Sequence, residues 1–192
     1  AKIHELEKVV ELDLKGEKKI VKTTRAVYTA SAVVIASGSH YRTLGVPGET
    51  EFRGRGVSYC TLCDGAFFKG GNVLVVGGGN SAVVSARYLA NIASKVKLAH
   101  RKGQLRAEEA LVKDLIAHGV EIMWNTELKE VKGDTKVKGV VLVNNRTGET
   151  REINVDGVFV QVGEAPNSQV AKEAGIEVDK AGYIIVDNRQ RT

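Results

Sequence analysis

The chain is short of cysteine, of proline and of long hydrophobic runs, and these shortages exclude several classes of protein. No apolar stretch in its 192 residues approaches the roughly 20 that a membrane-spanning helix needs, and the first residues show no signal-peptide pattern. Two cysteines are too few for a disulfide scaffold, and their close pairing fits a redox site in a reducing compartment. We therefore expect a cytoplasmic protein that does not associate with a membrane.

A strong charge of one sign is also missing. The chain has 28 basic and 23 acidic side chains, a net charge of +5, and no basic tract interleaved with aromatic residues. This pattern favours an ordinary solvated surface over a nucleic-acid interface. Glycine is abundant, with 21 residues, and a hydrophobic content of 43% allows a sizeable core. We expect an α/β protein of one large or two small domains.

The first 40 residues predict strands and turns. Alternating residues at 7–14, a turn at 15–18 and a return strand from residue 19 indicate a hairpin. Residues 32–36 form a continuous apolar run that is typical of a strand buried on both faces, and Ser37-Gly38-Ser39 ends this run.

The middle of the chain alternates between strand and helix patterns. Strands are expected at residues 73–76, 96–99 and 120–124, and helices at 81–93 and 108–118. This order is βαβαβ, one mononucleotide-binding half of a doubly wound fold.

Three further strands are expected to form an antiparallel meander, at residues 137–144, 151–155 and 158–162. The two prolines, Pro47 and Pro166, bracket the βαβαβ unit. Each stiffens a connection and disfavours helix just before it, so we interpret them as linker markers.

A glycine-rich turn follows the first strand of the βαβαβ unit. Gly77-x-Gly79-x-x-Ala82 comes after an expected strand and opens an expected helix, the context in which this pattern indicates dinucleotide binding. Gly77 permits the turn, Gly79 lets the backbone approach a pyrophosphate, and Ala82 allows close packing of helix on strand. The helix N-terminus offers free N–H groups to the phosphates. The alternative is a glycine turn that binds nothing.

A basic cluster ends the second strand of the unit, where an NAD-binding site carries an acidic residue. His100, Arg101 and Lys102 stand there, with Arg106 beyond them. Such a cluster suits the 2′-phosphate of NADPH, and the alternative is a solvated basic loop.

The only two cysteines are Cys60 and Cys63, in the spacing of a reversible dithiol. A zinc site is disfavoured because four scattered histidines would have to complete it, and we predict no metal. An inert buried pair remains open, and redox exchange is the favoured interpretation. Asp64 is a candidate acid/base, or else a turn or cap residue. Because hydride carries an electron pair and thiols exchange one sulfur at a time, a flavin mediator is expected.

The ordered set of motifs resembles the low-molecular-weight thioredoxin reductases over nearly the whole sequence. The motifs are Val34-Ile35-Ala36-Ser37-Gly38, Gly45-Val46-Pro47-Gly48-Glu49, Gly54-Arg55-Gly56-Val57-Ser58-Tyr59-Cys60-Thr61-Leu62-Cys63-Asp64-Gly65, Gly77-Gly78-Gly79-Asn80-Ser81-Ala82, His100-Arg101-Lys102 with Leu105-Arg106-Ala107, and Val162-Gly163-Glu164-Ala165-Pro166-Asn167.

The resemblance implies a role for each matching residue. Cys60 is the cysteine that attacks oxidised thioredoxin, Cys63 the one that meets the flavin ring, and Asp64 the acid/base. It also implies a homodimer for the full-length protein and a nucleotide domain that rotates about two linkers. The remaining implied sites are Ala36, Ser37 and Gly38 for FAD, Gly77, Gly79, Asn80, Ser81 and Ala82 for the NADPH pyrophosphate, His100, Arg101, Lys102 and Arg106 near its 2′-phosphate, and Arg55, Phe67 and Phe68 for docking thioredoxin.

The chain also departs from this family. The first G-x-G-x-x-G, for the ADP half of FAD, and the C-terminal Gly-Asp segment are absent. We therefore expect a fragment that binds FAD weakly or not at all. Lys102 replaces a commoner arginine and loses its bidentate fork, and Val84 replaces a glutamate near the nicotinamide, so NADPH preference is not assured.

The expected organisation is a three-layer, Rossmann-like NADPH and CxxC domain at residues 45–165. It is flanked by partial FAD-domain segments at 1–44 and 166–192. The expected activity is that of a thioredoxin-disulfide reductase, in which NADPH reduces FAD, FAD reduces the Cys60–Cys63 disulfide, and this pair reduces a thioredoxin-like protein. The alternatives are the flavoprotein of an alkyl hydroperoxide system, a dithiol oxidase, or a nucleotide-binding module without catalysis.

Overall fold

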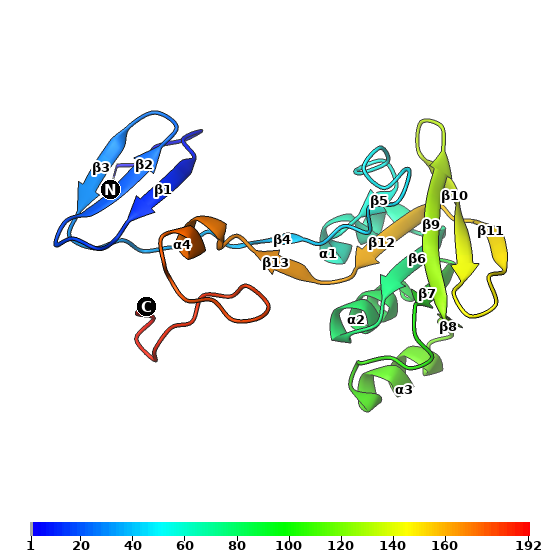
Figure 1. Cartoon of the computed structure of the whole chain (residues 1–192). Helices are drawn as coiled ribbons and strands as arrows, with labels where there is room; N and C mark the ends of the chain where they lie inside the picture. Colours follow the sequence, from blue (N-terminus) through cyan, green and yellow to red (C-terminus); the bar gives the residue numbers. More distant parts are fainter. Residues whose placement is uncertain (1) are drawn as a thin grey trace. The chain divides into compact units, whose positions relative to one another are not determined.

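The computed structural model describes residues 2–192, which divide into two compact units (Figure 1). One unit contains residues 41–163, and the other combines residues 2–40 with 164–192. The divisions fall a few residues before those expected from the sequence. The cofactor assigned to each unit stays a prediction.

A five-stranded parallel sheet forms the centre of the 41–163 unit. Its strand order is β5-β12-β6-β7-β8, and each neighbouring pair runs parallel. The bounds are β5 Val57–Ser58, β12 Gly157–Gln161, β6 Asn72–Gly77, β7 Lys95–His100 and β8 Glu121–Trp124.

Two helices connect the successive strands β6, β7 and β8. They are α2, Asn80–Leu89, and α3, Glu109–Ala117, so the predicted βαβαβ order is confirmed. Figure 1 shows both helices on the same side of the parallel sheet. Helix α2 was predicted to end at residue 93 but ends at Leu89, because the chain turns after that residue. Ile92 N donates to Leu89 O and Ser94 N to Gly71 O. These bonds redirect the chain into β7.

An antiparallel sheet of β9 (Thr126–Gly133), β10 (Val137–Asn144) and β11 (Thr150–Asn154) forms the third layer. The predicted meander was therefore wrong in its third strand, since residues 158–162 lie largely in β12 of the parallel sheet. β12 is buried along most of its length, whereas a meander strand has one solvated face. The sequence reading missed β9, whose Glu and Lys side chains alternate with buried residues.

The alternation of side chains along β6 explains the two cores of this unit. Val73 and Val75 pack toward α2 and α3, while Leu74 and Val76 pack toward the antiparallel sheet. Phe159 of β12 is fully buried on the helix side. The expected three-layer arrangement is therefore present.

The other unit contains an antiparallel sheet of β1 (Val9–Asp13), β2 (Lys19–Thr23) and β3 (Val27–Ala30), in that order. The hairpin prediction is confirmed. Helix α4 (Gln169–Glu173) is a single short element. None of the helices formed by residues 2–192 has the length and apolar character needed to cross a bilayer.

The prediction of a buried strand at residues 32–36 was wrong. The segment is irregular, and Val34 is 91% exposed. A strand buried on both faces needs pairing strands and covering layers, and within residues 2–192 nothing pairs with this one. The two chain crossings between the units run through β4 (Ser39–Tyr41) and β13 (Glu164–Pro166), which pair with each other.

Candidate dithiol and nucleotide site

The carboxyl ends of the parallel strands gather the predicted site residues of the 41–163 unit. β5 ends at Ser58, two residues before the first cysteine, and β6 ends at Gly77. β7 ends at His100 and β12 at Gln161. Because these ends lie at one edge of a parallel sheet, the cysteine pair, the glycine turn and the basic cluster share that edge. Ligands of open α/β sheets bind at this edge.

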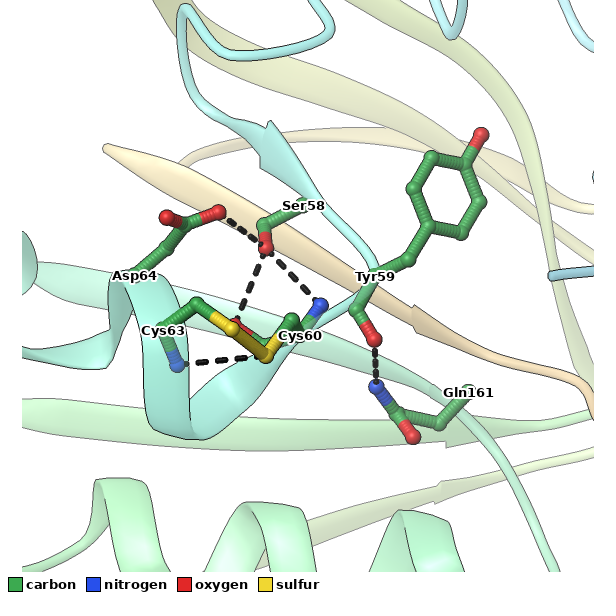
Figure 2. Close-up of a disulfide and its surroundings, with 6 residues drawn as sticks. All are labelled: Ser58, Tyr59, Cys60, Cys63, Asp64 and Gln161. Carbon is green, nitrogen blue, oxygen red and sulfur yellow. Dashed lines mark hydrogen bonds between the residues drawn. A yellow bond between two sulfur atoms is a disulfide. The ribbon is translucent and has the colours of Figure 1, made fainter. Parts of the chain in front are cut away.

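Cys60 and Cys63 form a disulfide, with their Cα atoms 5.3 Å apart (Figure 2). The pair opens the short helix α1, Thr61–Asp64, and Cys60 is its N-cap. Cys63 N donates to Cys60 Sγ at 3.2 Å, so a sulfur serves as the capping acceptor. Cys60 is half-buried and Cys63 is exposed, so the two sulfurs differ in access to solvent.

Ser58 ties Asp64 to the start of this helix. The hydroxyl of Ser58 lies 2.6 Å from Asp64 Oδ2, and it accepts a bond from Cys60 N at 3.1 Å (Figure 2). Ser58 is only 5% exposed, and Asp64 is half-buried. The sequence reasoning missed Ser58, whose one signal was its place two residues before the first cysteine. The structure thus gives the predicted acid/base a fixed orientation beside the disulfide.

Tyr59 anchors the other side of the cysteine pair. Its hydroxyl donates to Glu49 Oε1 at 2.8 Å, and burial, reinforced by this bond, raises the pKa of Tyr59 to about 12. Glu49 is 1% exposed and also accepts bonds from Leu44 N and Gly45 N. Gln161 Nε2 donates to the Tyr59 carbonyl at 2.8 Å. These groups fix the backbone that leads into Cys60.

The predicted docking residues line one cleft of about 540 Å³ together with Asp64. Phe67 is 83% exposed, as expected for a contact residue. Phe68 is half-buried and packs edge-to-face on Phe159, with ring centroids 5.2 Å apart, so it also belongs to the core. Arg55 lines the same cleft.

The three glycines of the nucleotide turn have different surroundings. A Cβ on Gly77 would lie 2.3 Å from Gln161 O and 2.6 Å from the Ala82 Cβ, so this glycine permits close packing of strand and helix. A Cβ on Gly78 would lie 2.1 Å from the His100 ring. Gly79 has nothing within 4 Å of that position. Only Gly79 therefore borders open space, as an approaching ligand requires.

The N-terminus of α2 is suited to an anion. Gly79 is its N-cap and supplies no side-chain cap; Ala82 N donates to Gly79 O at 3.1 Å, and the N–H groups of Asn80 and Ser81 remain for an anion. Ala82 is buried and Ser81 is exposed. Asn80 uses its side chain differently, in a reciprocal pair with Glu108 at 2.9 and 3.0 Å. Asn80 thus ties the start of α2 to that of α3, and its backbone remains beside the turn.

The basic residues separate into one buried ring and three exposed cations. His100 is 6% exposed, its Nε2 lies 3.0 Å from Gln104 O, and burial lowers its pKa. Arg101, Lys102 and Arg106 are exposed. The buried ring of His100 therefore packs against Gly78 of the turn. The exposed side chains of Arg101, Lys102 and Arg106 supply the positive charge.

A cleft of about 460 Å³ joins the glycine turn to part of this cluster. Arg101 and Arg106 line it with Gly77 and Gly78, whereas Lys102 and Gly79 lie outside it. Arg106 N donates to Gly78 O at 2.7 Å, and Asn145 Nδ2 donates to the Arg101 carbonyl at 2.8 Å, so both arginine backbones are held. The open Gly79, the uncapped helix and two arginines fit a pyridine nucleotide.

The three residues expected to touch FAD lie in the other unit. Asn167 donates through its side chain to Ser37 O at 2.9 Å and through its backbone to Gly38 O at 2.9 Å. Ala36 is exposed and lines a groove of about 870 Å³. In the part of this unit that the structure describes, residues 2–40 and 164–192, no glycine turn is followed by a long helix. Ala36, Ser37 and Gly38 alone therefore do not form a dinucleotide site.

No cluster of three or more metal-ligating side chains occurs in the part of the chain that the structure describes. The cysteines are paired with each other. The reactive groups described at this edge of the parallel sheet are therefore the Cys60–Cys63 disulfide, the Asp64 carboxylate and the Ser58 hydroxyl.

Comparisons with known proteins agree with the motifs. The thioredoxin reductase of Peptoclostridium acidaminophilum is 42% identical over 97% of this chain and 61% of its own length. That of Bacillus subtilis is 46% identical over 92% and 56%. The solved thioredoxin reductase of Lactococcus lactis aligns with a TM-score of 0.85 and 38% identity, covering 96% of this chain and 61% of that one. The chain therefore spans about 56–61% of the length of these relatives.

The resemblance inferred from the motifs is thereby confirmed. The model of the pyridine nucleotide-disulphide oxidoreductases matches residues 1–192. The chain belongs to the pyridine nucleotide-disulphide oxidoreductase family.

Proposed function

We propose that the chain carries the nucleotide and dithiol sites of a thioredoxin-disulfide reductase, with NADPH as electron donor and a thioredoxin-like protein as acceptor. One observation carries the proposal: a Cys60–Cys63 disulfide and an open glycine turn share one edge of the parallel sheet. A disulfide with only a structural role would not need a nucleotide-binding glycine turn beside it. The names of the curated relatives support the choice of acceptor.

The nucleotide would lie on the turn at Gly79, with its pyrophosphate against the first turn of α2. Arg101 and Arg106 would bind the 2′-phosphate, since both line the cleft. A flavin supplies the transfer of an electron pair between a pyridine nucleotide and a disulfide. Because Ala36, Ser37 and Gly38 do not by themselves form a dinucleotide site, their contact with FAD stays a prediction.

Once reduced, Cys60 and Cys63 would exchange with a substrate disulfide. The Cys60 thiolate attacks one substrate sulfur, and Cys63 then displaces it from the mixed disulfide. The enzyme is oxidised to its disulfide, and the substrate leaves as two thiols that take up the two protons of the cysteines. Asp64 would relay a proton from a cysteine to a departing sulfur and return to its starting state. The cleft lined by Arg55 and Phe67 would receive the partner protein.

Gly79→Ala tests the nucleotide site. Gly79 has φ −98° and open space around it, so alanine should leave the fold intact yet occupy the room that a pyrophosphate needs. We expect NADPH affinity to fall about tenfold or more in titration calorimetry. Gly16→Ala is a control, because Gly16 lies in a turn of the other unit with its nearest atom at 3.4 Å. Unchanged affinity in Gly79→Ala would refute the assignment.

Single alanine variants test the phosphate contacts. Arg101→Ala and Arg106→Ala should each weaken NADPH about tenfold and NADH much less, because each removes a charged hydrogen bond to the 2′-phosphate. Lys102→Ala, outside the cleft, should have a smaller effect. Equal losses for NADPH and NADH would favour a solvated basic loop.

Cysteine variants test the dithiol in a single turnover. The chain is reduced chemically, freed of reductant and mixed with oxidised thioredoxin. Parent protein should reduce it, Cys60→Ser should not, and Cys63→Ser should trap a mixed disulfide visible by mass spectrometry. NADPH binding should survive in both variants. Undiminished reduction by Cys60→Ser would exclude the proposed exchange.

A further inference from the structure

The Ser58 hydroxyl makes three contacts at the dithiol (Figure 2). It lies 2.6 Å from Asp64 Oδ2, 3.2 Å from the Cys60 carbonyl and 3.1 Å from Cys60 N. Cys60 N can only donate, while the carbonyl and the carboxylate accept. A hydroxyl has one hydrogen and two lone pairs, so it cannot donate to both acceptors fully at once. Which of the two acceptors receives the Ser58 hydrogen must therefore depend on whether Asp64 is protonated.

The carboxylate takes the hydrogen when Asp64 is ionised, because it is the charged and nearer acceptor. When Asp64 is protonated, its O–H can donate to the Ser58 oxygen, and the Ser58 hydrogen can turn to the Cys60 carbonyl at 3.2 Å. In both arrangements the Ser58 oxygen still accepts from Cys60 N. The same atoms can thus satisfy both protonation states without moving the backbone.

We propose that Ser58 is a positioning residue that holds Asp64 beside the cysteine pair through gain and loss of its proton. The inference rests on the proposed function, in which Asp64 relays a proton. It adds a group to which the predicted site residues assign no role.

None of the three contacts of Ser58 uses a sulfur atom, so breaking the S–S bond removes no atom from them. The helix cap, by contrast, uses Cys60 Sγ as acceptor for Cys63 N. Ser58 is 5% exposed, so water does not readily replace it. Within residues 2–192 it supplies the one side-chain hydrogen bond to Asp64.

Charged groups around Asp64 must be considered in any pH experiment. Arg55, Lys69, Lys136 and Asp156 line the same cleft as Asp64. Among the described residues none of these four hydrogen-bonds the Ser58 hydroxyl, so a Ser58 variant leaves their charges in place. A change caused by such a variant therefore reports on the hydroxyl.

The test compares Ser58→Ala, Ser58→Thr, Asp64→Asn and the Ser58→Ala/Asp64→Asn double variant, with the exposed Ser94→Ala as a control. Each chain is reduced chemically and mixed with a small aromatic disulfide in a single turnover between pH 5.5 and 9. Ser58→Ala should be about tenfold slower than the parent and have an altered pH profile. Ser58→Thr keeps the hydroxyl and should recover most of the rate.

The double variant gives the decisive comparison. If Ser58 acts through Asp64, the double variant should be no slower than Asp64→Asn alone. An additive loss, or a parental rate and pH profile in Ser58→Ala, would overturn the proposal. Failure of Ser58→Thr to recover the rate would also count against it.

Two measurements separate this inference from the proposed function. Should the parent fail to reduce disulfides, the function fails, and the pH profile of Cys63 alkylation by iodoacetamide then judges Ser58: a shifted profile in Ser58→Ala supports it, and an unchanged one refutes it. Should Ser58→Ala not fold, hydrogen exchange of the Cys60 amide in the parent decides. Its protection should persist whether Asp64 is ionised or protonated, and loss of protection in either state would refute the inference.

Discussion

The two units of the chain differ sharply in how much they bury. Nearly all buried apolar side chains lie in the 41–163 unit, and among residues 2–40 and 164–192 only Ala171 belongs to that set. Exposed apolar residues are prominent in the other unit instead, with Leu6 90% and Val34 91% exposed. Burial of apolar surface is the main stabilising term in folding, so the 41–163 unit should carry most of the stability.

This difference also separates the two sets of predicted site residues. The cysteines, the glycine turn and the arginines follow the ends of strands whose side chains are packed from both faces. Ala36, Ser37 and Gly38 stand on an irregular segment held chiefly by Asn167. A site needs a rigid support to keep its geometry, and only the first set has one.

The largest expected effect is on the core of the 41–163 unit. Phe159→Ala should lower the free energy of unfolding by about 3–5 kcal/mol, since Phe159 is fully buried and packs on Phe68. Val34→Ala, in the other unit, should change it by less than about 0.5 kcal/mol. Urea titration measures both, followed by fluorescence of Trp124, the single tryptophan, for the 41–163 unit and by far-ultraviolet circular dichroism for the other unit. Similar losses for both variants would contradict the comparison.

The sequence predicted the βαβαβ unit because its signals are local. Apolar periodicity, the glycine turn and the helix stop near Gly119 each lie within a few residues. The run at residues 32–36 failed because burial depends on neighbours that periodicity does not reveal. β9 was missed because its buried residues Leu128 and Val131 lie three positions apart across a register shift, which breaks the two-residue period of a strand.

The site residues, like the strands and helices, were predictable from the sequence only where their signals are local. Cys60, Cys63 and the glycine turn carry motifs at fixed spacing. Ser58 and Glu49 carry none, since serine and glutamate are common surface residues and their partners are set by the fold. Glu49 meets Tyr59 only because β5 ends beside the loop at Leu44.

A smaller effect is expected from two glutamate–tyrosine pairs, one in each unit. Glu49 is buried and accepts from Tyr59 and two backbone N–H groups, so Glu49→Gln would set an NH₂ group against donors. We expect a loss of about 2–3 kcal/mol. Glu7 of the other unit accepts from the hydroxyls of Thr23 and Tyr28, whose hydrogens can rotate away from an NH₂ group, so Glu7→Gln should move the unfolding midpoint less. Equal shifts would show that the fixed backbone donors at Glu49 do not distinguish the two pairs.

The pH dependence of stability should follow His100. Burial lowers its folded pKa below the usual 6.5, so the unfolded chain takes up the proton first as pH falls. The stabilising contribution is therefore full above about pH 6.5 and is lost as pH falls through the lower folded pKa. Urea titrations at pH 8 and 5.5 should show this loss in the parent and less of it in His100→Gln. His118→Gln, at the exposed end of α3, is the control. If His100→Gln lost as much stability between pH 8 and 5.5 as the parent, this account would be refuted.

The smallest expected effect is at Asp134, although the shift of its pKa is large. A hydrogen bond from Lys138, aided by the Thr135 backbone, lowers the pKa of Asp134 to about 2. The folded pKa lies below the ordinary 3.8, so any contribution exists above that value and is lost only as pH falls through about 2. The carboxylate is exposed, however, so solvent and salt screen the pair. Asp134→Asn should therefore leave the urea midpoint at pH 7 unchanged, with or without added salt. A loss comparable to that of Glu49→Gln would mean that ion pairing, rather than burial, sets the stability of the 41–163 unit.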